Sequence, residues 1–190
     1  MKPALIPPIA HLDLAAGRDF HLVLNHLLDQ PDYRAFYLAE SLGGAFIMLD
    51  NSAHEHTAGG PIESLLVNGR DIGASEIVLP DTLFDGSATL FNTLNAMDYV
   101  LGDGAAVYSE YKPRLAVVAQ GETIEEWAYS FWGLLAGYEF RRSRFEALGC
   151  PGLTIAVSKD YEMFKGGMMF LLERHILEAV SGTAPVMVSD

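Results

Sequence analysis

Phe46-Ile47-Met48-Leu49-Asp50 decides the fold, because four apolar residues lead directly into a carboxylate. A short, continuous apolar run bounded by polar residues is typical of a buried strand. Pro61 then begins a stretch with apolar residues at helical spacing to about Asp71, and proline is favoured in the first turn of a helix. This part of the chain therefore predicts one strand–helix unit whose strand ends in a chemically useful group.

The same unit recurs along the chain. Strands and helices that alternate in this way predict an α/β fold with a parallel sheet. The strands are almost continuously apolar, as expected when both faces of a sheet are covered. The further predicted elements are strands at Glu76–Leu79, Arg114–Ala119 and Leu153–Val157, and helices at Ser87–Leu101 and from Thr123, with Glu126 in a capping box, to about Leu148.

The ends of the chain are less regular. Apolar spacing is the main signal in these segments, and prolines near the start suit an edge strand. The expectations are an edge strand within Leu5–Leu14, a helix over Asp19–Leu28, either a strand or a helix at Tyr33–Ala39, a largely helical stretch from Asp160 to about Val180 and one more strand from Pro185.

A TIM-type (β/α) barrel fits this pattern better than a nucleotide-binding sheet. No GxGxxG or Walker sequence follows any predicted strand, and several strands end in functional groups, which is where barrels carry their chemistry. A full barrel takes about 250 residues, whereas this chain has 190. We therefore predict that residues 1–190 form a single, incomplete barrel domain. It would be a truncated piece, a reduced barrel or one half of a split enzyme.

Composition limits the classes of partner. A formal net charge of -13 disfavours autonomous binding to nucleic acid, although a local basic patch or a partner subunit could supply it. Cys150 is the one cysteine, so no internal disulfide is possible, and a reducing compartment is the simplest inference. No apolar run is long enough to span a bilayer. We expect a cytoplasmic protein without membrane contact.

Polar residues follow four of the predicted strands, and a parallel sheet brings such ends to one edge. Asp50, Asp81, Gln120 and Ser158 mark these four positions. Carboxylates accept hydrogen bonds from ring N–H and amino groups, and an amide can donate or accept, so the set suits a neutral heterocycle. Two acids in a dry pocket also tend to have pKa values pushed apart, which suits proton transfer. Helix caps, turns and plain loops are the alternative readings of the same residues.

The strand ends also resemble a known family. Leu49-Asp50-Asn51-Ser52-Ala53-His54-Glu55 resembles the Asp-Ser-Gly-Gly-Phe-Gln signature of the queuine/archaeosine tRNA-guanine transglycosylases, and is closer still to the looser form in their phage relatives, which put 7-deazaguanines into DNA. Val118-Ala119-Gln120-Gly121 is similar to the family's Val-Gln-Gly strand end. Leu79-Pro80-Asp81 lies in order where the family has a base-binding aspartate, and Leu153–Ser158 where it has a Gly-Gly-Leu-Ala-Val strand.

The resemblance implies a function and a set of roles. The chain would exchange guanine for a 7-deazaguanine in nucleic acid, with DNA preferred over tRNA because the Cys/His zinc cluster of the tRNA enzymes is absent. It would need no cofactor and no metal, and a phage-encoded chain would act in the host cytoplasm. Asp50 would act as general acid/base, Asp81 would bind the pyrimidine edge of the base, Gln120 and the Gly121 backbone would contact its carbonyl side, and Asn51, Ser52, Ala53 and Ser158 would line the pocket.

Departures from the family keep two alternatives open. The family's nucleophile is an aspartate on a later strand, and Asp190 at the end of this chain is a poor substitute. The chain could therefore be a non-catalytic partner subunit in a homo- or hetero-oligomer. Alternatively, His54 and His56 together with the aspartates could ligate a metal in a barrel hydrolase.

Overall fold

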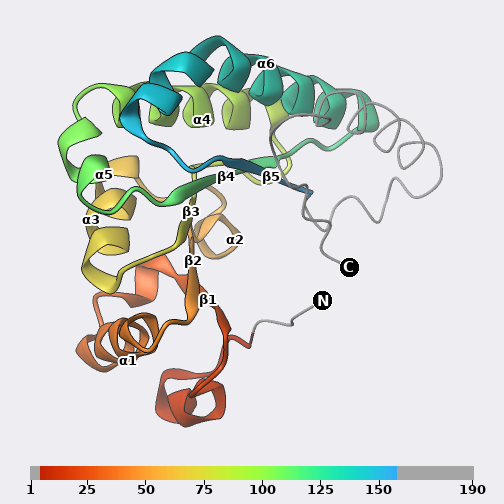
Figure 1. The fold of residues 1–190 in the computed structure, drawn as a ribbon. Helices are drawn as coiled ribbons and strands as arrows, with labels where there is room; N and C mark the ends of the chain where they lie inside the picture. Colours follow the sequence, from red (N-terminus) through yellow and green to blue (C-terminus); the bar gives the residue numbers. More distant parts are fainter. Residues whose placement is uncertain (1–4, 158–190) are drawn as a thin grey trace.

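A curved parallel sheet forms the centre of the molecule. The computed structural model describes residues 5–157, and their five strands pair in chain order, every pair parallel. The strands bend progressively from β1 to β5, so that the sheet has a convex and a concave side (Figure 1). The strands are β1 (Phe20–Leu24), β2 (Phe46–Asp50), β3 (Glu76–Val78), β4 (Arg114–Ala119) and β5 (Leu153–Val157).

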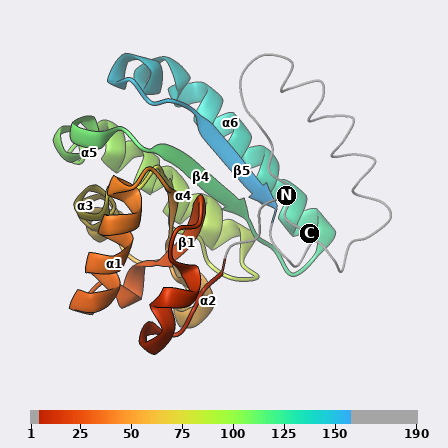
Figure 2. The same cartoon turned by 60° about the horizontal axis from the view of Figure 1, so that its bottom comes forward.

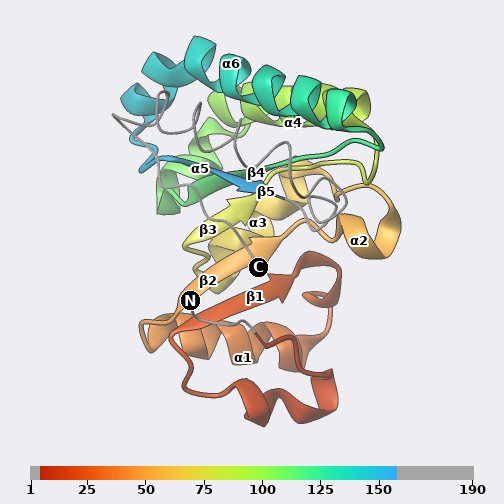
Figure 3. The same cartoon turned by 90° about the vertical axis from the view of Figure 1, so that its right-hand side faces the viewer.

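The longer helices lie along the convex side of this sheet (Figures 1 and 2). Figure 3 looks onto the concave side, where β1 and β2 point toward the edge that carries the short α2. Among residues 5–157, no helix combines the length and apolar character needed to cross a membrane. The helices are η1 (Ile9–Ala15), η2 (Asn25–Leu27), α1 (Pro31–Leu42), α2 (Ala53–His56), α3 (Ile62–Ile72), α4 (Gly86–Leu101), α5 (Ala105–Tyr111) and α6 (Ile124–Leu148).

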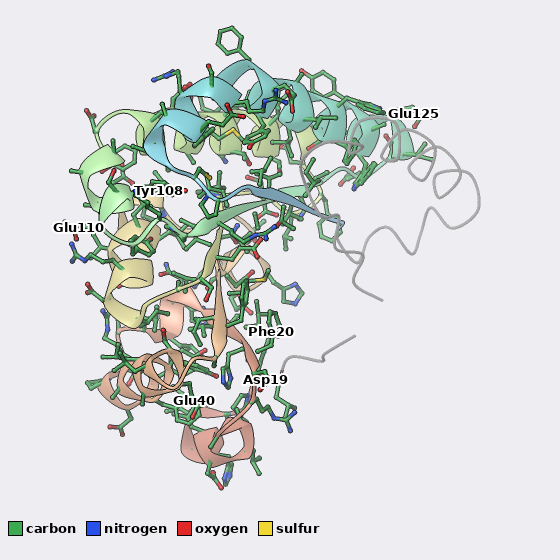
Figure 4. The ribbon with its side chains drawn as sticks, viewed as in Figure 1. Asp19, Phe20, Glu40, Tyr108, Glu110 and Glu125 are labelled. Atoms are coloured by element: carbon green, nitrogen blue, oxygen red, sulfur yellow. The ribbon has the colours of Figure 1, made fainter. Side chains whose placement is uncertain are left out.

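Alternate strand residues divide between the two sides of the sheet. Val23, Ile47 and Leu49 are fully buried against the helices, as are their counterparts on β3 and β4. Because successive side chains of a strand point to opposite faces, Asp50 belongs to the concave side. Phe20 and Phe46 stack there with their ring centroids 5.7 Å apart. Figure 4 shows Phe20 on this side and Glu110 on the outer, helical side.

The strong strand–helix units are confirmed. The runs beginning at Phe46, Glu76, Arg114 and Leu153 are all strands, and the segment Tyr33–Ala39 lies within helix α1. Thr123 caps α6 as predicted, since its hydroxyl accepts from the Glu126 N–H at 3.2 Å. The stretch from Asp160 to Val180 and the strand from Pro185 lie outside the described residues.

Two N-terminal predictions are wrong. The segment Asp19–Leu28 is not a helix but strand β1 followed by η2, because Phe20–Leu24 pairs with β2 and buries alternate residues. Its apolar spacing fits a helix and a short strand equally well, so periodicity could not separate them. No edge strand forms at Leu5–Leu14, where η1 begins directly after Pro7 and Pro8. Helix α5 was not predicted at all.

The exposure of α4 gives a test of the fold. The apolar spacing of Ser87–Leu101 predicts that Phe91 and Met97 both face the core, but Phe91 is 67% exposed and only Met97 is fully buried. We expect Met97→Ala to lower the free energy of unfolding by about 2–5 kcal/mol, because it leaves a cavity. Phe91→Ala should change it by no more than about 0.5 kcal/mol. Urea unfolding of both variants measures this, and equal losses would contradict the orientation of α4.

Candidate functional site

The ends of β2, β3 and β4 bring the predicted site residues together. Asp81 is 3% exposed, and its two carboxylate oxygens accept from different strand ends. Asn51 Nδ2 donates to Oδ1 at 2.6 Å, and Gln120 Nε2 donates to Oδ2 at 2.6 Å. Asn51 and Gln120 are each 2% exposed. Asp81 therefore joins three neighbouring strands in one buried polar cluster.

Asn51 holds this cluster in place from β2. Its Nδ2 also donates to the carbonyl of Leu79 at 2.7 Å, and its Oδ1 accepts from the Ala53 N–H at 2.8 Å. One amide thus fixes the chain before Asp81 and the first turn of α2. The side chain was expected only to line a pocket, but its contacts show that it positions Asp81 and the backbone around it.

Asp50 is partly buried beside this cluster and has an unusual acidity. Burial raises its pKa to about 6, a hydrogen bond from the Ser52 N–H at 2.8 Å opposes the rise, and the negative charge of Asp81 adds to it. Burial also raises the pKa of Asp81, although the hydrogen bonds from Gln120 and Asn51 oppose that rise. A carboxyl group with a pKa near 6 can gain and lose a proton close to neutral pH, as a general acid or base must.

Gln120 presents an unused acceptor at the site. Its Nε2 is committed to Asp81, and its Oε1 is buried with no hydrogen-bond partner among residues 5–157. A buried acceptor without a donor costs about 1–3 kcal/mol. A ligand that brings an N–H group to this oxygen would recover that free energy.

His26 belongs to the same edge of the sheet and was missed by the sequence analysis. It follows β1, and its ring Nδ1 lies 2.9 Å from the hydroxyl of Ser52. Ser52 adopts a left-handed backbone with φ 63°, which aims its hydroxyl at His26 and its N–H at Asp50. The residue was overlooked because β1 was taken for a helix, so no strand end was expected there.

A short crossing segment, residues 57–60, closes over the cluster. The Gly59 N–H donates to the Asp81 carbonyl at 2.8 Å, and the Gly60 N–H donates to the Asn51 carbonyl at 2.9 Å. A Cβ at Gly59 would lie 2.9 Å from both Asn51 Cγ and Pro80 Cα. Only glycine allows the segment to approach this closely, and no sequence pattern had marked it.

Gly121 has a structural role that its predicted binding role does not include. A Cβ there would lie 2.8 Å from the Glu126 carbonyl carbon and the Trp127 Cα. Glycine thus lets α6 begin directly beside the end of β4. Glu126 also accepts from the Gly86 N–H at 3.0 Å, which ties the start of α4 to the same corner. Ser158, the last predicted site residue, lies outside the described residues.

The other candidate constellations find ordinary structural explanations. His54 and His56 are exposed on α2, and residues 5–157 contain no group of three His, Cys, Asp or Glu side chains that could hold a metal. Helix α6 also carries a basic cluster, Arg141, Arg142 and Arg144. Arg141 donates to both oxygens of Asp98, at 2.8 and 2.6 Å. Arg142 pairs with two acids of its own helix. These arginines are neutralised locally.

Comparison of the chain with protein-family models and with curated proteins found no match. The assignment of a function therefore depends on the geometry of the strand ends and on the chemistry that their side chains can perform.

The acidity of Asp50 predicts a pH dependence of stability. Its pKa is higher in the folded chain than in the unfolded one, so the stability that it contributes is present at low pH and is lost as pH rises through about 6. Asp50→Asn removes this titration and should stabilise the protein above pH 6 by about 1–3 kcal/mol. Urea unfolding at pH 5 and pH 8 would show a clearly smaller gain at pH 5, where the folded carboxyl is still mostly protonated, than at pH 8. An equal effect at both pH values would contradict the proposed burial of this charge.

Proposed function

We propose that this chain binds a guanine-like base at the polar cluster around Asp81, with Asp50 beside it, and is part of a transglycosylase-type enzyme. The observation that carries the proposal is the position of Asp81, whose carboxylate accepts from both Asn51 and Gln120 across three strand ends. The residues that resemble the family's base-binding set thus meet in space, although they come from separate parts of the chain.

The sheet supports an incomplete TIM-type (β/α) barrel as the scaffold. Strands of a barrel follow chain order and carry their helices on the outside, whereas a doubly wound sheet reverses its order and has helices on both faces. Here the order is β1-β2-β3-β4-β5, and the longer helices lie on the convex side. In that arrangement the concave side corresponds to the inside of a barrel, and the candidate site to its functional end.

The donor pattern of guanine matches the groups in this cluster. A guanine-like base presents a ring N–H and an exocyclic amino group, and both are hydrogen-bond donors. Asp50, Asp81 and the Gln120 Oε1 are all acceptors. Each carboxylate oxygen has more than one lone pair, so Asp81 can accept from a base without releasing either amide. An adenine-type base has an exocyclic amino group but an acceptor nitrogen in place of the neighbouring ring N–H, so it cannot offer this pair of donors and should not bind.

The acidity of Asp50 fits the proton transfer that base exchange requires. A leaving guanine must gain a proton and an incoming base must lose one, and a carboxyl group with a pKa near 6 can serve both steps. The covalent step of the family needs a further aspartate, for which residues 5–157 offer no match to the family's strand. We propose that another part of the enzyme, or a partner subunit, supplies it. In the alternative, in which this chain is a non-catalytic partner subunit, it would still bind the base but would take no part in the covalent step.

The polymer that carries the base is proposed to be DNA rather than tRNA. The single cysteine cannot build the zinc module of the tRNA enzymes. The arginines of α6 are paired with acids and so do not offer a free basic surface for a phosphate backbone. Because the net charge is -13, contact with the polymer would come from a partner or a local surface.

Calorimetric titration with 7-cyano-7-deazaguanine tests the base site. We expect saturable binding by the wild type and at least about tenfold weaker binding by Asp81→Asn, which is about 1.4 kcal/mol. Asp103→Asn changes an exposed carboxylate away from the cluster and should bind as the wild type does. A 7-deazaadenine should give no heat. Equal affinities of Asp81→Asn and wild type, or no binding by the wild type, would contradict the proposal.

A further inference from the structure

A cavity lies beside the candidate site, between the end of β1 and the first half of α3. Its volume is about 490 Å³, within the range of small-molecule sites. Asp50, Asp81 and Gln120 do not line it. The residues around it are Asn25, His26, Asp29, Glu63, Ser64, Val67 and Asn68.

The floor of this cavity is a fixed network of amides. Asn25 is only 9% exposed, and its Oδ1 accepts from Asn68 Nδ2 at 2.8 Å. Its Nδ2 lies 3.3 Å from the hydroxyl of Ser64, to which it donates. Arg34 of α1 holds Asn68 from the other side by donating to its Oδ1 at 2.8 Å. These contacts orient the polar groups before any ligand arrives.

Two carboxylates of the cavity wall have no partner in the part of the chain that the structure describes. Asp29 and Glu63 are exposed and make neither a hydrogen bond nor an ion pair through their side chains within residues 5–157. The guanidinium of Arg34 does not neutralise them, because it pairs with Asp71 at 3.1 Å and donates to the Leu28 carbonyl. The cavity therefore combines a rigid polar floor with an uncompensated negative charge.

We propose that this cavity binds a small organic cation with two alkylammonium groups, each paired with one of the carboxylates Asp29 and Glu63. Ammonium groups match carboxylates in charge and in hydrogen bonding, and Val67 offers an apolar contact for the alkyl chain between them. Anions such as phosphate are disfavoured by the same charges. A bare metal ion is disfavoured too, because the described residues contain no group of three metal-capable side chains.

His26 places this cavity next to the base site without merging the two. Its ring lines the cavity, its Nδ1 lies 2.9 Å from the Ser52 hydroxyl, and the Ser52 N–H donates to Asp50. Because different side chains build the two sites, the cation can bind without a base. A negative result in the base titration would therefore leave the cation proposal standing, and the reverse also holds.

The test is calorimetric titration with putrescine, 1,4-diaminobutane, at low ionic strength. We expect saturable binding by the wild type and at least about tenfold weaker binding by the double variant Asp29→Asn/Glu63→Gln. The control variant Asp13→Asn/Asp103→Asn removes two exposed carboxylates away from the cavity and should keep the wild-type affinity. Butane-1,4-diol, which has the same length and no charge, should not bind.

Three results would overturn the proposal. Absence of saturable binding by the wild type would remove the site. Equal weakening in both double variants would show that putrescine responds only to the overall charge of the protein. Binding of the diol as tight as that of the diamine would show that the cavity recognises polar chains without regard to charge.

Discussion

A buried carboxylate between two amides is the interaction on which the whole site depends. Burying Asp81 is costly unless hydrogen bonds compensate, and Asn51 and Gln120 provide them at 2.6 Å each. Because these amides follow β2 and β4 while Asp81 follows β3, the same two bonds fix the relative position of three strand ends. The charge of Asp81 also helps to raise the pKa of Asp50, so that one side chain sets both the geometry and the acidity of the site.

The fold can hold this arrangement because backbone segments approach one another closely around it. Gly59 lets the crossing segment lie against Asn51 and Pro80, and Gly121 lets α6 begin beside the end of β4. Glu126 then links that first turn of α6 to Gly86 at the start of α4. The crossing segment and the starts of α4 and α6 thus lie against the ends of β3 and β4, where Asp81 and Gln120 are 3% and 2% exposed.

Sequence reasoning succeeded where the local pattern has a single interpretation. The run before Asp50 and the run Arg114–Ala119 are apolar and bounded by polar residues, so both strands and the convergence of their ends could be predicted. It failed at β1, where the apolar spacing fits both a strand and a helix. Because no strand end was expected there, His26 was not predicted as a site residue. The unpaired Oε1 of Gln120 and the close approach of Gly59 depend on contacts between distant segments, which no local pattern contains.

The side-chain amide of Gln120 offers the most direct measurement of the central claim. In ¹⁵N-labelled protein, its resonance can be assigned by comparison with Gln120→Glu and followed during titration with 7-cyano-7-deazaguanine. If the base enters the cluster around Asp81, the amide resonances of Gln120 and Asn51 should shift together and saturate at the same ligand concentration. Binding that leaves both resonances unmoved would place the ligand elsewhere and contradict the account.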